Sequence, residues 1–149
     1  MRLVVACVAL LVVLAFPGCG GDDGDGKGSF VDQADVVCSE AEAEISRVPP
    51  PQDPTDPLQL AGFLERAVPV AQKQNAELKE LERPDEQRAQ INELIAALDA
   101  EVDAAERMLA AAKREDRQAI QQLLTESGFA SAQAKRAAAE LNLAVCGAA

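Results

Sequence analysis

The sequence contains no histidine, tryptophan or tyrosine, and only four of its 149 residues are phenylalanine. Without histidine, a Ser-His-Asp arrangement, a Glu-x-x-His di-metal motif and a histidine zinc site are all excluded. We find no other pattern of catalytic, cofactor-binding or metal-ligating residues. The sequence therefore predicts a protein that is not an enzyme and that uses no cofactor.

Long hydrophobic runs are also scarce. The one such run covers residues 3–16, directly after Met1 and Arg2. A membrane-spanning helix needs about 20 apolar residues, so this run is too short to cross a bilayer. A charged start, an apolar middle and a small-residue exit are instead the layout of a secretory signal peptide.

Residues 16–19, Phe-Pro-Gly-Cys, resemble a bacterial lipobox, the motif that ends in the lipidated cysteine of a lipoprotein. Gly18 matches the small residue before the cleavage site, whereas Phe16 and Pro17 depart from the usual Leu and Ala or Ser. The resemblance implies cleavage between Gly18 and Cys19 and a diacylglyceryl group on the Cys19 sulfur, with further acylation of the palmitate type. Two acyl chains hold a protein stably on a membrane. The alternatives are a plain secreted protein and an uncleaved anchor.

The segment after Cys19 has no apolar residue from Gly20 to Ser29. Such a segment buries nothing, so we expect a disordered Gly/Asp linker. It resembles a calcium loop only faintly, because no glutamate stands at the twelfth position from any of its aspartates. The expected organisation is a signal peptide over 1–18, a lipidated cysteine and linker over 19–29, and a folded ectodomain over 30–149.

The net charge of the mature chain disfavours two classes of partner. Loss of Arg2 with the signal peptide leaves 13 basic and 25 acidic residues, a charge of −12. Nucleic acid and anionic lipid repel such a body. We therefore expect no nucleic-acid partner, and we expect the acyl chains to hold the protein on the extracytoplasmic face of the cell membrane.

Four segments repeat apolar residues every three or four positions, the period of one helix face. Prolines separate the first three, because proline disfavours helical geometry at its own position and at the residue before it. Asp56 is the expected N-cap of the second helix, Pro69 should kink or split it, and Gly128 should weaken the fourth. The expected helices cover 30–48, 57–82, 84 to about 112, and 115 to the C-cap at Gly147, and the expected stripe of the fourth is Ile120, Leu123, Leu124, Ser127, Ala134, Leu141 and Val145.

Short connections between these helices favour an all-α, antiparallel up-down four-helix bundle. A longer dimeric coiled coil of the third and fourth helices is the alternative, and the sequence does not fix the oligomeric state.

Cysteine parity predicts one disulfide bond. Cys7 leaves with the signal peptide and Cys19 is lipidated, so Cys38 and Cys146 remain as an even pair. An oxidising compartment and adjacent first and last helices favour a bond between them. A free or reactive pair is the alternative.

The mature chain resembles a broad set of uncharacterised small lipoproteins of high-GC Gram-positive bacteria. The shared stretches are "FVDQADVVCSEAEAEI", "ERAVPVA", "LKELERPDE" and "AAAELNLAVCG". The resemblance implies a helical, disulfide-closed ectodomain and carries no catalytic residues.

Two groups of residues are candidates for a site. Asp99, Asp103 and Glu106 share one helix face, where three carboxylates would hold a hard cation if they faced inward, but the apolar stripe lies elsewhere and predicts a solvated face. The large apolar residues Phe63, Met108 and Phe129 would surround a small ligand beside Pro69, or belong to the core.

These features predict a membrane-tethered, non-enzymatic module that binds an unidentified envelope protein or other envelope component. The alternative is a ligand-binding or sensor lipoprotein with a pocket near the kinked second helix.

Replacing Cys19 with Ala should release the protein from membranes or leave an uncleaved precursor, because it removes the only thiol at the lipobox. Fractionation of cells that express the variant, with immunoblotting, measures this. Normal cleavage together with unchanged membrane attachment would contradict the lipobox assignment.

Overall fold

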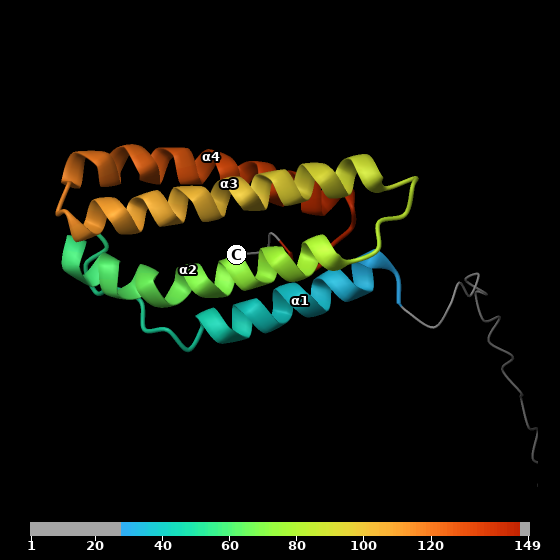
Figure 1. Ribbon diagram of the computed structural model, residues 1–149, viewed down its shortest axis with the longest axis horizontal. Coiled ribbons are helices and arrows are strands. Elements are labelled where there is room, and N and C mark those ends of the chain that lie inside the picture. Colours follow the sequence, from blue (N-terminus) through green and yellow to red (C-terminus); the bar gives the residue numbers. More distant parts are fainter. Residues whose placement is uncertain (1–27, 147–149) are drawn as a thin grey trace, which may run out of the picture.

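The computed structural model describes residues 28–146, and within this range it contains four helices and no strand (Figure 1). Their bounds are α1 Phe30–Ile45, α2 Pro57–Glu80, α3 Arg88–Lys113 and α4 Arg117–Glu140. The all-helical class predicted from the sequence is confirmed. The predicted signal peptide with Gly18, the predicted lipidation site Cys19, the predicted linker up to residue 27 and the predicted cap at Gly147 lie outside the described residues.

Local sequence signals explain where α1 and α2 begin. The Ser29 hydroxyl accepts a hydrogen bond from the Asp32 amide, and the Asp32 carboxylate accepts one from the Ser29 amide, which forms a capping box. Asp56 caps α2 as predicted, accepting from the Leu58 amide at 2.9 Å, and Pro57 occupies the first helical position.

Several predicted helix bounds are wrong by a few residues. The first helix ends at Ile45 and not at Val48, and the third begins at Arg88 because residues 84–87 form a turn before it. The second and fourth helices are not split, since α2 continues through Pro69 and α4 through Gly128. Pro69 is exposed, so its ring lies on the solvent side of α2.

The end of α4 is the largest difference from the prediction. Asn142 has a φ of 58°, and the Leu143 amide donates to the Ala138 carbonyl at 3.0 Å. This is a Schellman motif, and asparagine is one of the few residues besides glycine that readily adopt its left-handed position. The helix therefore stops at Glu140. Val145 and Cys146 lie in a non-helical C-terminal segment, Leu141–Cys146, and not in the fourth helix.

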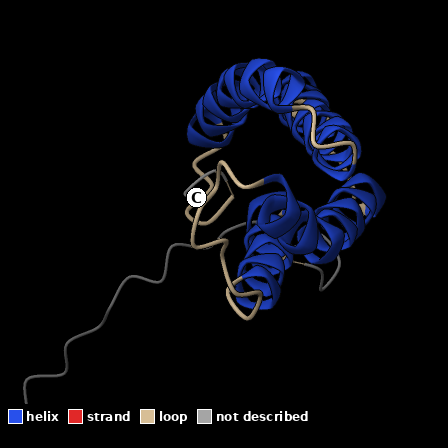
Figure 2. Ribbon diagram, turned by 90° about the vertical axis from the view of Figure 1, so that its left-hand side faces the viewer, coloured by secondary structure: helices blue, strands red, loops and turns tan. Residues whose placement is uncertain are grey.

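Helices that follow one another in the chain pack together, as in a bundle. α1 contacts α2, α2 contacts α3, and the α3–α4 contact is the most extensive. α1 and α4 make little direct contact, and the view along the helices shows an arc and not a closed ring (Figure 2). The first and last helices are thus not the close neighbours that the sequence predicts.

The C-terminal segment, and not a direct contact between α1 and α4, joins α1 to the rest of the fold. Cys38 of α1 and Cys146 are at disulfide-bonding distance, with Cα atoms 5.2 Å apart, so the predicted pair is brought together. One turn away, the Asp35 carboxylate accepts hydrogen bonds from the amides of Val145 at 2.9 Å and Ala144 at 3.0 Å. Burial alone would raise the pKa of Asp35, but its hydrogen bonds to backbone amides outweigh burial and hold that pKa below the ordinary 3.8.

Replacing both Cys38 and Cys146 with Ala should lower the free energy of unfolding by a few kcal/mol. The chain-entropy model gives about 4.7 kcal/mol for a loop of about 100 residues, and the loop here spans 108. Helix content at low temperature should persist, because each helix keeps its own hydrogen bonds. Urea unfolding followed by circular dichroism measures both quantities, and an unchanged unfolding free energy would contradict a structural role for the pair.

Candidate functional site

The hydrophobic core of the described residues is divided into two clusters along the bundle. One contains Phe30, Leu78, Leu94, the two cysteines and Leu141, among others, and the second contains Leu60, Val68, Met108, Ile120 and Leu123, among others. Between the two clusters, the middle parts of α2, α3 and α4 contain no large apolar side chain that is buried. The stretches concerned are residues 69–77 of α2, 99–107 of α3 and 124–133 of α4.

A pocket with a volume of about 340 Å³ lies at this level, and we call it the central pocket. All four helices and the C-terminal segment line it. The lining residues are Cys38, Glu42 and Ile45 of α1, Ala71 and Gln74 of α2, Leu98 and Glu101 of α3, Ser131 and Ala134 of α4, and Val145 and Cys146. A second hollow, also with a volume of about 340 Å³, lies between only two helices, α3 and α4, beside Glu93 and Arg136.

The lining combines apolar walls with a few polar groups. Ile45, Leu98 and Val145 supply aliphatic surface from three different elements. The Gln74 side chain donates a hydrogen bond from Nε2 to the Cys38 sulfur at 3.2 Å. This bond connects α2 to the side of the pocket that Cys38 and Cys146 form. An apolar pocket with a few convergent polar groups is the usual form of a small-molecule site.

Glu101 is the most unusual group in the central pocket. Its side chain is half-buried, and burial raises its pKa above the ordinary 4.5. The nearby Ser131 hydroxyl and the charge of Lys135 lower this pKa, but they offset only part of the effect of burial. The pocket therefore holds a carboxyl group that is poorly solvated and incompletely compensated by positive charge.

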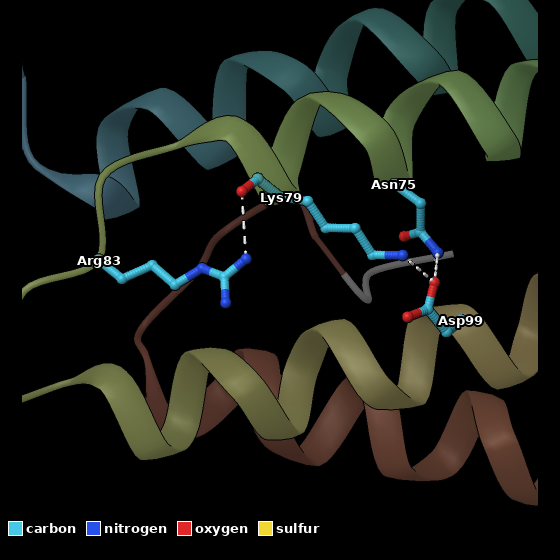
Figure 3. Close-up of polar contacts among 4 residues, drawn as sticks. All are labelled: Asn75, Lys79, Arg83 and Asp99. Carbon is cyan, nitrogen blue, oxygen red and sulfur yellow. Dashed lines mark hydrogen bonds and ion pairs between the residues drawn. The ribbon is translucent and has the colours of Figure 1, made fainter.

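A polar contact between α2 and α3 fixes the helices that carry Gln74 and Glu101 (Figure 3). The Asp99 carboxylate accepts hydrogen bonds from Asn75 Nδ2 at 3.0 Å and from Lys79 Nζ at 2.6 Å. Asn75 is 6% exposed, so its hydrogen bond satisfies a buried polar group. Arg83 donates to the Lys79 carbonyl at 3.1 Å, close to the end of α2.

The three acidic residues predicted to share a solvated face are all exposed, as expected. Asp99 bonds to α2 as described, Glu106 accepts from Gln72 at 2.5 Å, and Asp103 is 3.5 Å from Arg107. Within residues 28–146, no group of three or more carboxylate or cysteine side chains is arranged to hold a metal ion.

The three large apolar residues considered as a ligand site do not come together. Met108 is buried and Phe63 packs against the same core cluster, whereas Phe129 is 70% exposed on α4. Leu124, expected in the stripe of the fourth helix, is 51% exposed. The three side chains therefore do not surround a common site, and Phe63 and Met108 belong to the core, which was the other interpretation of the sequence.

Glu101 and Ser131 were missed as site residues, although the sequence contains a signal for both. Glu101 stands three residues after Leu98 and three before Ala104, which are both buried, so it interrupts the apolar stripe of α3. Ser131 lies three residues before the buried Ala134 in the same way. A polar residue inside an apolar stripe indicates a gap in the core or a pocket.

Comparison of the chain with protein-family models, with curated proteins and with solved structures finds no match. Among the helices of the described residues, none combines the length and the apolar character that crossing a membrane requires.

Replacing Glu101 with Gln should raise the free energy of unfolding at about pH 7. The folded-state pKa is raised, so the ionised carboxylate destabilises the fold above that pKa. Below the ordinary 4.5, the carboxyl is neutral in both states and the difference between variant and wild type should vanish. Urea unfolding over a pH series measures this, and a variant that is less stable than wild type at neutral pH would contradict the desolvation of Glu101.

Proposed function

We propose that the protein is a lipid-anchored, non-enzymatic binding lipoprotein on the extracytoplasmic face of the membrane. In this proposal residues 1–18 are removed, Cys19 carries the acyl chains, and residues 19–29 are the linker. Residues 30–149 form an up-down antiparallel bundle. The lipobox-like sequence supports the anchor, and the packing of consecutive helices supports the bundle.

The central pocket is the observation that favours one of the two kinds of occupant considered from the sequence. Its walls come from four helices and the C-terminal segment, and its volume of about 340 Å³ lies in the range of small-molecule sites. A flat surface would favour a partner protein, whereas a concave, largely apolar pocket favours a small ligand. We therefore propose that the protein binds a small ligand, and that this ligand occupies the central pocket.

The proposal of a non-enzymatic role rests on the groups in the pocket. Ser131 has an acid, Glu101, as its neighbour, and no histidine exists in the chain to act as its general base. Glu42 and Glu101 are the ionisable groups of the lining, and binding is the function that such a lining supports best.

A partner protein is the second candidate, and one observation favours it. Leu124 and Phe129 of α4 are both more than half exposed. Exposed apolar side chains of this kind indicate a contact surface when they form a continuous patch.

Replacing Ala71 with Phe should abolish binding of Nile red, a neutral dye whose fluorescence rises in apolar surroundings. Ala71 is half-buried in the pocket wall, so a phenyl ring at this position would fill the pocket. Titration of the purified full chain with the dye measures the effect, and Ser131→Leu provides a second way to fill the pocket if Ala71→Phe lowers stability.

The matched control is Phe129→Ala, which removes the most exposed aromatic side chain and leaves the pocket intact. Loss of the dye signal in Ala71→Phe but not in Phe129→Ala would support the small-ligand proposal. The reverse result would contradict it and would favour the exposed surface of α4.

A further inference from the structure

The charged side chains that line the central pocket have one sign. Glu101 of α3 and Glu42 of α1 are both acidic, and the lining contains no lysine or arginine. The remaining polar groups, Gln74 and Ser131, are neutral. The walls therefore offer hydrogen-bond acceptors and negative charge together with aliphatic surface.

A positive charge in the pocket would stabilise the Glu101 carboxylate. Its half-buried carboxylate has lost part of its hydration, and the nearby Lys135 of α4 is itself exposed. A carboxylate in such a site is stabilised when a positive charge approaches it out of water. An ammonium group in the pocket would supply that charge. The half-buried Glu101 would therefore make the pocket select cationic ligands over neutral ones.

The charge of the whole protein acts in the same direction. The mature chain would carry −12, and a strongly negative body attracts small cations and repels small anions. An acidic pocket in an acidic protein thus disfavours anionic ligands twice, once at long range and once at the site.

We propose that the ligand of the central pocket is a small organic cation, with its ammonium group at Glu101 and its apolar body against Ile45, Leu98 and Val145. This inference rests on the proposed function, because it names the class of ligand for the same pocket. It excludes small carboxylates and phosphates as ligands and ranks neutral apolar molecules below amines.

Three probes with the same ring and different head groups test the inference: cyclohexylammonium, cyclohexanol and cyclohexanecarboxylate. The purified full chain is labelled with ¹⁵N and titrated with each probe at about pH 7, and the chemical shifts give the dissociation constants. Hydrogen bonds to charged groups are stronger than neutral ones, so the ammonium should bind about tenfold more tightly than the alcohol. The carboxylate should not bind measurably.

Glu101→Gln should remove the advantage of the ammonium over the alcohol, and both probes should then bind with similar affinity. Glu93→Gln is the matched control, because Glu93 is an exposed acid on the same helix outside the central pocket. It makes the same change in net charge, and it should keep the tenfold preference. If both variants lost the preference for the ammonium over the alcohol to the same extent, the proposed role of Glu101 would be overturned.

The outcomes also separate this inference from the proposed function. If the alcohol binds wild type as tightly as the ammonium, the cationic ligand class is overturned while the pocket stands. If the carboxylate binds best, the cationic ligand class is overturned and the pocket prefers anions. If no probe binds and Nile red is also insensitive to Ala71→Phe, both the ligand class and the proposed small-ligand function fail.

Discussion

Asp35 and Cys38 lie one turn apart on α1, and both attach that helix to the C-terminal segment. This attachment matters because α1 packs less extensively on α2 than the other helices pack on one another, and it makes little direct contact with α4. α1 also supplies one wall of the central pocket through Glu42 and Ile45. Without its link to the C-terminal segment, α1 would be held mainly by α2, and the pocket would open along that side.

The same attachment explains why a pocket can exist in such a small bundle. A closed ring of four helices fills its interior with interlocking side chains. Here the C-terminal segment separates α1 from α4 near Cys146, and the side chains at the next level are short, such as Ala71 and Ala134. The interior is therefore incompletely filled between the two core clusters, and the half-buried Glu101 lies in that gap.

The sequence predicted the helices well, because their signals are local. Periodic apolar residues, the Asp56 cap and the prolines between segments each act within a few residues. The pairing of Cys38 with Cys146 followed from counting cysteines. The end of α4 could not be predicted in the same way, because Asn142 ends it although Gly147 offers the stronger cap signal.

The site was less accessible from the sequence, because it depends on contacts between distant segments. Leu124 fits the apolar period of α4, yet it is 51% exposed, because burial depends on which other segments pack against that side of the helix. Large apolar side chains such as Phe129 suggested a pocket, but a pocket forms where large side chains are missing. Glu101 could have been noticed as a polar interruption of an apolar stripe. Its half-buried state, however, depends on contacts between helices, such as those that bring Ser131 and Lys135 of α4 close to it, and no single-helix pattern encodes them.

The central claim is that a small ligand occupies the pocket between α1, α3 and the C-terminal segment. Intermolecular nuclear Overhauser effects between bound Nile red and protein methyl groups test it most directly, because they report distances below about 5 Å to individual side chains. The account predicts contacts from the dye to the methyl groups of Ile45, Leu98 and Val145. Contacts to the Leu124 methyl groups and the Phe129 ring alone would contradict it.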